Sequence, residues 1–193
     1  IGVCLEDNES LPETFLRRAQ PTRLIKVVNS GVNSLTRFAL ETKPQFSTAE
    51  LGELVTEAKR CGARVMVHAN GEIPVRTAIE AGCDSIEHGF FMGRQNLELM
   101  AERGVYWVTT IFTMKAVVQN SEYYRGTIDK KVAEQNLAHQ LEQLALARKL
   151  GVKVALGTDS GSIGVLHGES MVEEMKLFRQ AGFSLGETIQ CAT

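Results

Sequence analysis

The sequence lacks any long apolar segment and any concentration of basic residues. In its 193 residues, no apolar run approaches the roughly 18 residues that a membrane-spanning helix needs. The formal net charge is −2, aromatic residues make up only 6%, and no basic run or aromatic-studded basic stripe occurs. These absences argue against a membrane protein and against a surface that binds nucleic acid.

The four cysteines are too few and too widely spaced for a disulfide scaffold, and no pair has Cys-x-x-Cys spacing. Cys61 and Cys83 each stand beside a glycine at an expected element boundary. We expect free thiols that are buried as small hydrophobes, and therefore a reducing compartment such as the cytoplasm. The chain begins at Ile1 rather than Met, so a signal peptide upstream stays open as an alternative.

The sequence does contain a recurring glycine at the junction between a helical pattern and a short apolar run. These junction glycines are Gly62, Gly82, Gly104 and Gly151. Glycine just past a helix accepts the left-handed backbone that ends the helix, and a short apolar run then reads as a buried strand. Strict alternation of strands and helices indicates a parallel sheet with helical crossovers.

The pattern predicts five strands, at 23–29, 64–68, 84–88, 105–110 and 152–157. It predicts helices at 48–61, 73–81, 94–103, 129–150, 169–181 and from about 185, and capping boxes Ser47-x-x-Glu50 and Ser184-x-x-Glu187 mark two of their starts. Residues 111–128 are expected to form a loop, long enough to act as a lid or to select a substrate.

The short spacing between successive glycines places each strand beside the next, which favours a barrel over an open doubly wound sheet. No Gly-x-Gly-x-x-Gly follows a strand, so the main reason to expect a dinucleotide-binding fold is missing. A closed (β/α)₈ barrel needs eight strands and usually about 250 residues. We therefore predict an α/β chain that forms one incomplete TIM-type barrel domain over residues 1–193.

Four residues with metal-binding chemistry fall in or directly after these strands. His68 and His88 end two successive strands, Asp159 follows the last one, and Lys26 lies in an otherwise apolar strand. Each residue alone has an ordinary explanation, as a packed histidine, a capping aspartate or a lysine that reaches solvent. Functional groups of such barrels gather at the carboxyl ends of the strands, so together these residues predict a metal site.

Imidazole and carboxylate ligands suit Zn²⁺ or a similar divalent ion. Such an ion lowers the pKa of a bound water from 15.7 to about 7, and a nearby carboxylate can take and return the proton. The predicted site therefore indicates a hydrolase.

These motifs, in this order, resemble the amidohydrolase superfamily, and in particular its imidazolonepropionase-like and Xaa-Pro or arginine-type dipeptidase branch. They are Leu24-Ile25-Lys26-Val27, Val67-His68-Ala69-Asn70-Gly71, Ser85-Ile86-Glu87-His88-Gly89 and Gly157-Thr158-Asp159-Ser160-Gly161. The resemblance runs from about Arg23 to Thr193. It implies strands four to eight of the barrel, in a C-terminal fragment whose N-terminal strands and small β domain lie outside the sequence.

The resemblance also implies roles for single residues. Lys26 matches a lysine that CO₂ converts to a carbamate bridging two metals, so one or two ions are expected. His68 and His88 match metal ligands, and Asp159 matches an aspartate that binds metal and relays the proton of the attacking hydroxide. Asn70 stands where many relatives have a second histidine, which makes it a candidate substrate contact. The His-x-His pair of the family's first strand is absent.

Three residues lie outside this set. His167, followed by Gly168, resembles a His-Gly pair of this branch and is expected either to contact substrate or to cap a helix. Phe112, in the expected 111–128 loop, is a candidate for the substrate pocket. His139 falls in a polar stretch of the long helix and is expected to be exposed.

The function implied is hydrolysis of an amide or peptide-like C–N bond, by a metal-activated hydroxide, in a small-molecule or dipeptide-like substrate. A lactone hydrolase, a phosphoester hydrolase and a deaminase of the same superfamily stay open as alternatives. A different alternative is a non-catalytic partial barrel, inactive alone, whose uncovered strand edges favour association into a homo-oligomer.

Overall fold

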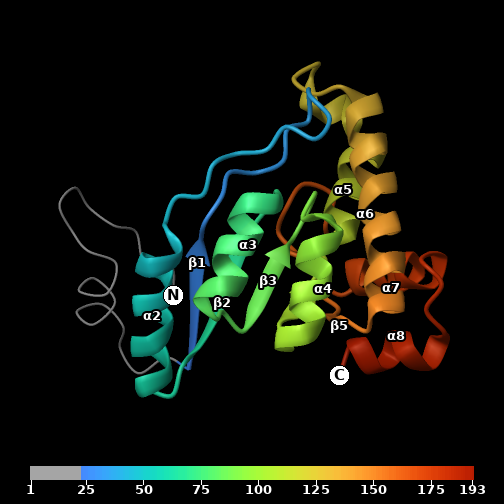
Figure 1. Ribbon diagram of the computed structural model, residues 1–193. Coiled ribbons are helices and arrows are strands. Elements are labelled where there is room, and N and C mark those ends of the chain that lie inside the picture. Colours follow the sequence, from blue (N-terminus) through green and yellow to red (C-terminus); the bar gives the residue numbers. More distant parts are fainter. Residues whose placement is uncertain (1–22) are drawn as a thin grey trace.

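The computed structural model describes residues 23–193, in which strands alternate with helices (Figure 1). The strands are β1 (Leu24–Val28), β2 (Arg64–Ala69), β3 (Ser85–His88), β4 (Tyr106–Val108) and β5 (Lys153–Ala155). The helices are α2 (Thr48–Arg60), α3 (Glu72–Ala81), α4 (Gly93–Arg103), α5 (Ile111–Gln119), α6 (Lys130–Leu150), α7 (Glu169–Gln180) and α8 (Leu185–Cys191), with a 3₁₀ turn, η1 (Ser121–Tyr124). Every predicted strand and helix that falls in the described residues is present, to within a few residues at its ends.

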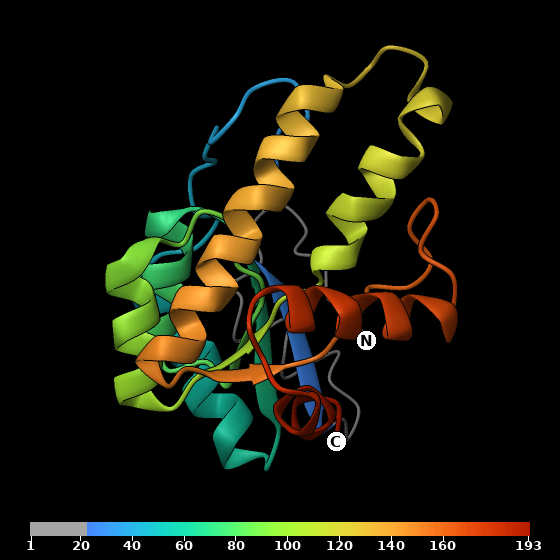
Figure 2. The ribbon, with the colours of Figure 1, turned by 90° about the vertical axis from the view of Figure 1, so that its right-hand side faces the viewer.

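The strands form one parallel sheet whose order in space is their order in the chain, β1-β2-β3-β4-β5. Figure 1 shows α2, α3 and α4 side by side over one face of this sheet. In Figure 2 the long α6 continues the helical layer beyond α4, and α6, α7 and α8 pack in succession. Consecutive parallel strands with helices outside them form an arc of a (β/α)₈ barrel, which confirms the predicted fold class. Residues 1–22 of the predicted domain lie outside the described residues.

Alternation along β2 decides which side chains meet the helices and which face the inside of the arc. Val65, Val67 and Ala69 are buried against the helical layer. Successive side chains of a strand point to opposite faces, so His68 faces the concave side. The register pairs Val28 with His68 and Ala69 with His88, so the ends of β1, β2 and β3 meet at the same edge of the sheet.

The junction glycines end helices as predicted. Gly82, Gly104 and Gly151 are the C-caps of α3, α4 and α6 and have φ values of 87°, 69° and 74°. Gly62, one residue past the C-cap of α2, has φ 72°. Residues with a Cβ adopt this left-handed backbone only at a cost, which explains the recurrence of glycine.

The prediction of a loop over residues 111–128 is wrong, because α5 and η1 occupy most of this segment. Ile111 and Ala116 of α5 are buried in the main core, and Met114 is buried in a second cluster beside the pocket. The start of this helix carries no local signal, since its N-cap Thr110 makes no capping hydrogen bond through its side chain. Its first amides are instead satisfied by a carboxylate from α7, far along the sequence.

The segment between β1 and α2 reaches across the strand ends to the start of α6, as Figures 1 and 2 both show. The amide of Asp129 donates to the carbonyl of Leu35 at 2.8 Å, and the Asn136 side chain donates to the carbonyl of Ser34 at 3.0 Å. This crossing encloses one side of the space above the strand ends.

The cysteines are free thiols, as predicted for those described, but they are not uniformly buried. Cys83 is buried, Cys191 is partly buried and Cys61 is exposed, while Cys4 lies outside the described residues. Cys61 is exposed because it caps α2 on the outer side of the helical layer rather than in the core. In residues 23–193, no helix combines the length and apolar character needed to cross a bilayer.

Candidate active site at the strand ends

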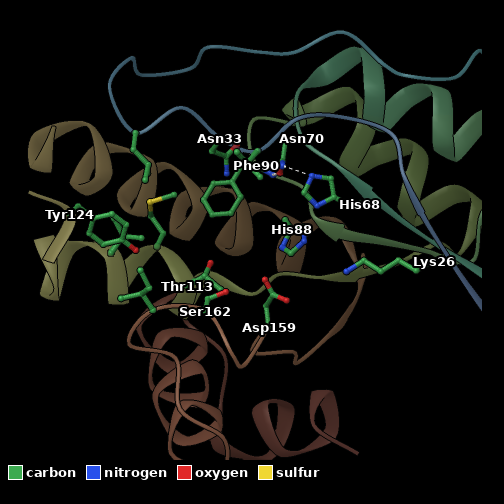
Figure 3. Close-up of a pocket in the computed structure, with 15 residues that line it drawn as sticks. Lys26, Asn33, His68, Asn70, His88, Phe90, Thr113, Tyr124, Asp159 and Ser162 are labelled. Atoms are coloured by element: carbon green, nitrogen blue, oxygen red, sulfur yellow. Dashed lines mark hydrogen bonds between the residues drawn. The ribbon is translucent and has the colours of Figure 1, made fainter. Parts of the chain in front are cut away.

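A pocket of about 460 Å³ lies at the carboxyl ends of the strands (Figure 3). Of the residues predicted from sequence, it brings together Lys26, His68, Asn70, His88 and Asp159. The remaining lining residues come mainly from the 32–35 segment, from α5 with η1 and from the loop after β5: Val32, Asn33, Leu35, Phe90, Thr113, Met114, Val117, Tyr124, Ser162 and Ile163.

The polar end of the pocket is built around two neighbouring imidazoles. The ring centroids of His68 and His88 are 4.6 Å apart, with 65° between their planes. Figure 3 shows the amine of Lys26 and the carboxylate of Asp159 directed into the space beside His88, from opposite sides. Three strands and the loop after β5 therefore each contribute one ionisable side chain to the same place.

Both imidazoles are neutral at neutral pH. Burial lowers the pKa of His68, and the charge of Lys26 lowers it further, against the opposing effects of the Gly31 carbonyl and Asp159. Burial also lowers the pKa of His88 to about 3, with smaller contributions from His68 and Lys26. Neutral imidazole is the form that binds a metal ion or accepts a proton.

Hydrogen bonds fix His88 from both its ring and its backbone. Its Nδ1 lies 2.7 Å from Oγ1 of Thr110, and its carbonyl accepts from Nε1 of Trp107 at 2.9 Å and from Nε2 of Gln140 at 2.6 Å. His88, Thr110 and Asp159 have φ values of 67°, 45° and 50°. Such left-handed backbone costs a residue with a Cβ about 1–3 kcal/mol and is concentrated at functional sites, where surrounding contacts hold it.

His68 is held less tightly, and Asn70 joins it to the end of β3. The Nε2 atom of His68 lies 3.3 Å from the Gly31 carbonyl and 3.4 Å from Nδ2 of Asn70. The side-chain oxygen of Asn70 accepts a hydrogen bond from the backbone amide of Phe90 at 3.0 Å. The backbone amide of Asn70 donates to Oγ of Ser30 at 2.9 Å. Asn70 thus braces the pocket wall and presents only its amide nitrogen toward His68.

Three residues do not lie where sequence reasoning put them. Phe112 does not line the pocket, because α5 turns its side chain into the core, where it is only 6% exposed. His167 is exposed on the loop before α7 and is also not among the lining residues. His139 is half-buried rather than exposed, because its ring packs 4.7 Å from that of Phe91, and burial lowers its pKa.

Sequence reasoning missed the polar side chains that support the pocket. Asn136, Gln140 and Gln143 are buried on one side of α6, and Nε2 of Gln143 donates to the Gly89 carbonyl at 3.3 Å and to Oε1 of Gln140 at 2.8 Å. Their spacing of four and three residues is a helical stripe, and it could have signalled a buried polar face. Glu174, 0% exposed, had no such signal, because it stands in a charged stretch that reads as solvated.

Glu87, directly before His88, is a second buried carboxylate that sequence reasoning passed over. It is 5% exposed and accepts a hydrogen bond from Oγ of Ser85 at 2.6 Å. Burial raises its pKa, while the charges of Lys26 and Asp159 act in opposite directions on it. A glutamate inside a short strand between an apolar residue and a histidine was the available signal.

The donors fit a divalent metal ion in their chemistry but not in their spacing. Two neutral imidazoles, a carboxylate and an amine that can form a carbamate are the donor types such a site uses. Within residues 23–193, however, no three His, Cys, Asp or Glu side chains come close enough together to hold an ion. A complete site therefore needs the carbamate on Lys26, a movement of Asp159, or donors from outside the described residues.

Comparisons with known proteins give the following likenesses. A sequence model described as the amidohydrolase family matches residues 2–193. Ochratoxinase of Aspergillus niger is 33% identical over 196 residues, which cover 99% of this chain and 39% of that protein. An uncharacterized protein of Mycobacterium tuberculosis is 28% identical over 200 residues, which cover 99% of this chain and 51% of that protein.

Two solved structures extend these likenesses to the fold. A Xaa-Pro dipeptidase with bound methionine in its active site has a TM-score of 0.75 and 30% identity, over 94% of this chain and 43% of that one. The structure of A. niger ochratoxinase has a TM-score of 0.73 and 29% identity, over 94% of this chain and 39% of that one. The chain thus spans about half, or less, of the length of each of these relatives.

Proposed function

Because this chain belongs to the amidohydrolase family, as its resemblance predicted, we propose that it forms the strand-end part of a metal-dependent site that hydrolyses an amide or peptide-like C–N bond. The observation that carries this proposal is the pair of neutral imidazoles, His68 and His88, 4.6 Å apart at the polar end of one pocket. Lys26 and Asp159 line the same end.

Lys26, His68, His88 and Asp159 are the residues that would hold Zn²⁺ or a similar divalent ion. One ion requires only the imidazoles and the carboxylate, whereas two ions would call for a carbamate on Lys26. When bound, such an ion polarises a carbonyl and makes water acidic enough to attack at neutral pH. The lowered pKa values of His68 and His88 support this role, because they keep both rings in the ligating form.

The residues of the chain itself supply proton transfer and substrate contact. Asp159, the carboxylate directed into the polar end of the pocket, takes a proton from the attacking water and delivers it to the leaving amine. The amide nitrogen of Asn70 faces the same space and can donate a hydrogen bond to a polar group of the substrate.

The other end of the pocket supports a substrate with an apolar group. Its lining is largely apolar: Val32, Leu35, Phe90, Met114, Val117, Tyr124 and Ile163. The charged lining residues, Lys26 and Asp159, are both at the polar end (Figure 3). No acidic side chain from residues 23–193 lines the apolar end, which supports an apolar dipeptide-like substrate over an arginine-containing one.

The relatives support a small substrate of this kind. One similar structure is the Xaa-Pro dipeptidase with bound methionine, and another is a prolidase complexed with N-methylphosphonate-L-proline. A dipeptide-like substrate for this chain follows by analogy with them. The predicted homo-oligomer stays a prediction.

A second candidate function is a partial barrel that binds no metal by itself. The observation that favours it is that residues 23–193 bring no three His, Cys, Asp or Glu donors together. In this case the chain would acquire activity only in association with the other strands of a barrel.

Cobalt binding distinguishes the two candidates. Co²⁺ is titrated into the purified chain and its visible absorption is followed, beside His68→Ala, His88→Ala and, as a matched control, His139→Ala, which changes a histidine outside the pocket. The leading proposal expects a Co²⁺ spectrum that both pocket variants abolish and the control keeps. A chain without any Co²⁺ spectrum would favour the partial barrel, and a spectrum unchanged in both pocket variants would refute the site.

A further inference from the structure

The turn from β4 into α5 is an unusual helix start. Thr110 occupies the N-cap of α5 with left-handed backbone, at φ 45°. A threonine at an N-cap ordinarily uses its hydroxyl to accept a hydrogen bond from one of the first amides of its own helix. Here the hydroxyl of Thr110 makes no such bond and lies instead 2.7 Å from Nδ1 of His88. The first amides of α5 therefore need another acceptor.

Glu174 of α7 is that acceptor. Its Oε1 accepts from Oγ1 of Thr109 and from the amide of Ile111, both at 2.8 Å, and its Oε2 accepts from the amide of Phe112 at 2.6 Å. These donors flank Thr110 on both sides. The carboxylate is 0% exposed, and burial raises its pKa to about 7 against the opposing effect of the three donors.

The contact between Thr110 and His88 and the contacts of Glu174 with α5 are linked through the backbone of residues 109–112. If Thr110 turned its hydroxyl to its own helix, His88 would lose the partner of its Nδ1 atom. The distant carboxylate removes that competition, because it already satisfies the amides of Ile111 and Phe112. Hydrogen-bonding one ring nitrogen fixes the ring's orientation and directs the other nitrogen, Nε2, elsewhere.

We propose that Glu174 is a positioning residue for His88: it caps α5 in place of Thr110, so that the Thr110 hydroxyl holds Nδ1 of His88 and leaves Nε2 free to face the pocket. This inference rests on the proposed function in that His88 acts there through Nε2. The contacts that carry it are independent of any bound ion or substrate.

The backbone of His88 is anchored separately, which makes the proposal specific. Its carbonyl is held by Trp107 and Gln140, and neither side chain forms a hydrogen bond with Glu174, although Nε2 of Gln140 also lies 3.5 Å from the Thr109 carbonyl. Loss of the carboxylate should therefore release the ring of His88 while the end of β3 stays in place. A purely structural role for Glu174 would instead loosen α5 and leave the ring unaffected in a folded protein.

Long-range ¹H–¹⁵N NMR of the histidine rings tests this in the metal-free full chain. Spectra are recorded at about pH 8, where Glu174 carries its charge, and the His88 signals are assigned by their loss in His88→Gln. The wild type should show one dominant neutral tautomer, because the Thr110 hydroxyl holds Nδ1. Glu174→Gln should change the ratio of the two tautomers by up to about tenfold, the scale of one neutral hydrogen bond.

Glu173→Gln is the matched control, since it removes the same charge from the neighbouring position. Glu173 links α7 to Lys115 of α5 at 2.8 Å but accepts no hydrogen bond from residues 109–112. The control should leave the His88 signals unchanged. Thr110→Val, which removes only the hydroxyl, should reproduce the effect of Glu174→Gln and serves in its place if that variant does not fold.

A His88 tautomer that stays unchanged in every folded variant of Glu174 and Thr110 would overturn the proposal. So would a change in Glu174→Gln that Thr110→Val does not reproduce, because it would exclude the route through the hydroxyl. Since the measurement uses neither metal nor substrate, a negative result here is distinguishable from a failure of the proposed hydrolase function.

Discussion

Raising the pH from about 5 to 8 should lower the free energy of unfolding through one side chain, Glu174. Burial raises the pKa of this carboxyl from its ordinary 4.5 to about 7 in the folded protein. The folded state then holds the proton more tightly than the unfolded state, so stability is full below pH 4.5 and falls as the pH rises toward 7. At 1.36 kcal/mol per pKa unit, the difference between the pKa values of Glu174 in the unfolded and folded states, 4.5 and about 7, corresponds to about 3 kcal/mol of stability in full.

The assay is urea unfolding of the full chain at several pH values between about 5 and 8. Glu174→Gln, which cannot ionise, should remove this contribution, so that the difference in stability between variant and wild type changes by about 2–3 kcal/mol over this range. Glu173→Gln is again the control. Hydrogen bonds from Lys115 and Lys176 lower the pKa of Glu173 to about 2, so its contribution is present above 4.5 and is lost only in more acidic solution. The control should therefore keep the pH dependence of the wild type.

Two results would refute this reasoning. A difference in stability between Glu174→Gln and the wild type that stays constant from pH 5 to 8 would show that the carboxyl does not titrate in this range. A difference that changes in the opposite direction would show that the three donors to Glu174 outweigh its burial. The wild-type curve alone does not decide this, because the lowered pKa of His88 raises stability as the pH rises from 5 to about 6.5.

Two further substitutions, with Gly52→Ala as a control for the first, test the packing around the strand ends by urea unfolding. Gly89→Ala should destabilise the protein by about 2 kcal/mol or more, because its φ is 61° and an added Cβ would lie 2.7 Å from Nε1 of Trp107. Gly52→Ala, where an added Cβ on α2 meets nothing within 4 Å, should instead stabilise the protein by about 0.5–1 kcal/mol. Equal effects of the two substitutions would contradict the geometry. Asn70→Ala should cost about 1–3 kcal/mol, because the buried amide of Phe90 loses its acceptor, and a neutral substitution would exclude the bracing role of Asn70.

Much of the fold, and the polar end of the pocket, could be predicted because their signals are local. Glycine past a helix end and an apolar run after it mark each helix–strand junction, and the ends of parallel strands gather at one edge. His68, His88 and Asp159 could therefore be placed together from sequence alone. Lys26 joined them because a charge in an apolar strand stands out.

The parts that escaped prediction depend on contacts between distant segments. The start of α5 has no local cap. The carboxylate that accepts from its first amides belongs to Glu174, which follows Ile111 by 63 residues and Phe112 by 62. The sequence therefore predicted a loop where the structure has helix α5, and the burial of Phe112 by this helix was not expected. The polar face of α6 was missed for the same reason, since Gln140 is buried only because it meets the His88 carbonyl.

The sequential strand order also determines when each part of the pocket can form during synthesis. Each strand pairs with the preceding one, so the sheet can grow as the chain leaves the ribosome. The bond from Thr109 to Glu174 spans 65 residues, which take roughly 3–13 s to add at ordinary rates of translation. We therefore expect the nascent chain to carry His88 on a paired strand before the carboxylate that orients its ring exists. In this interval the imidazole would be free to turn, and the geometry of the pocket would be completed only when α7 docks.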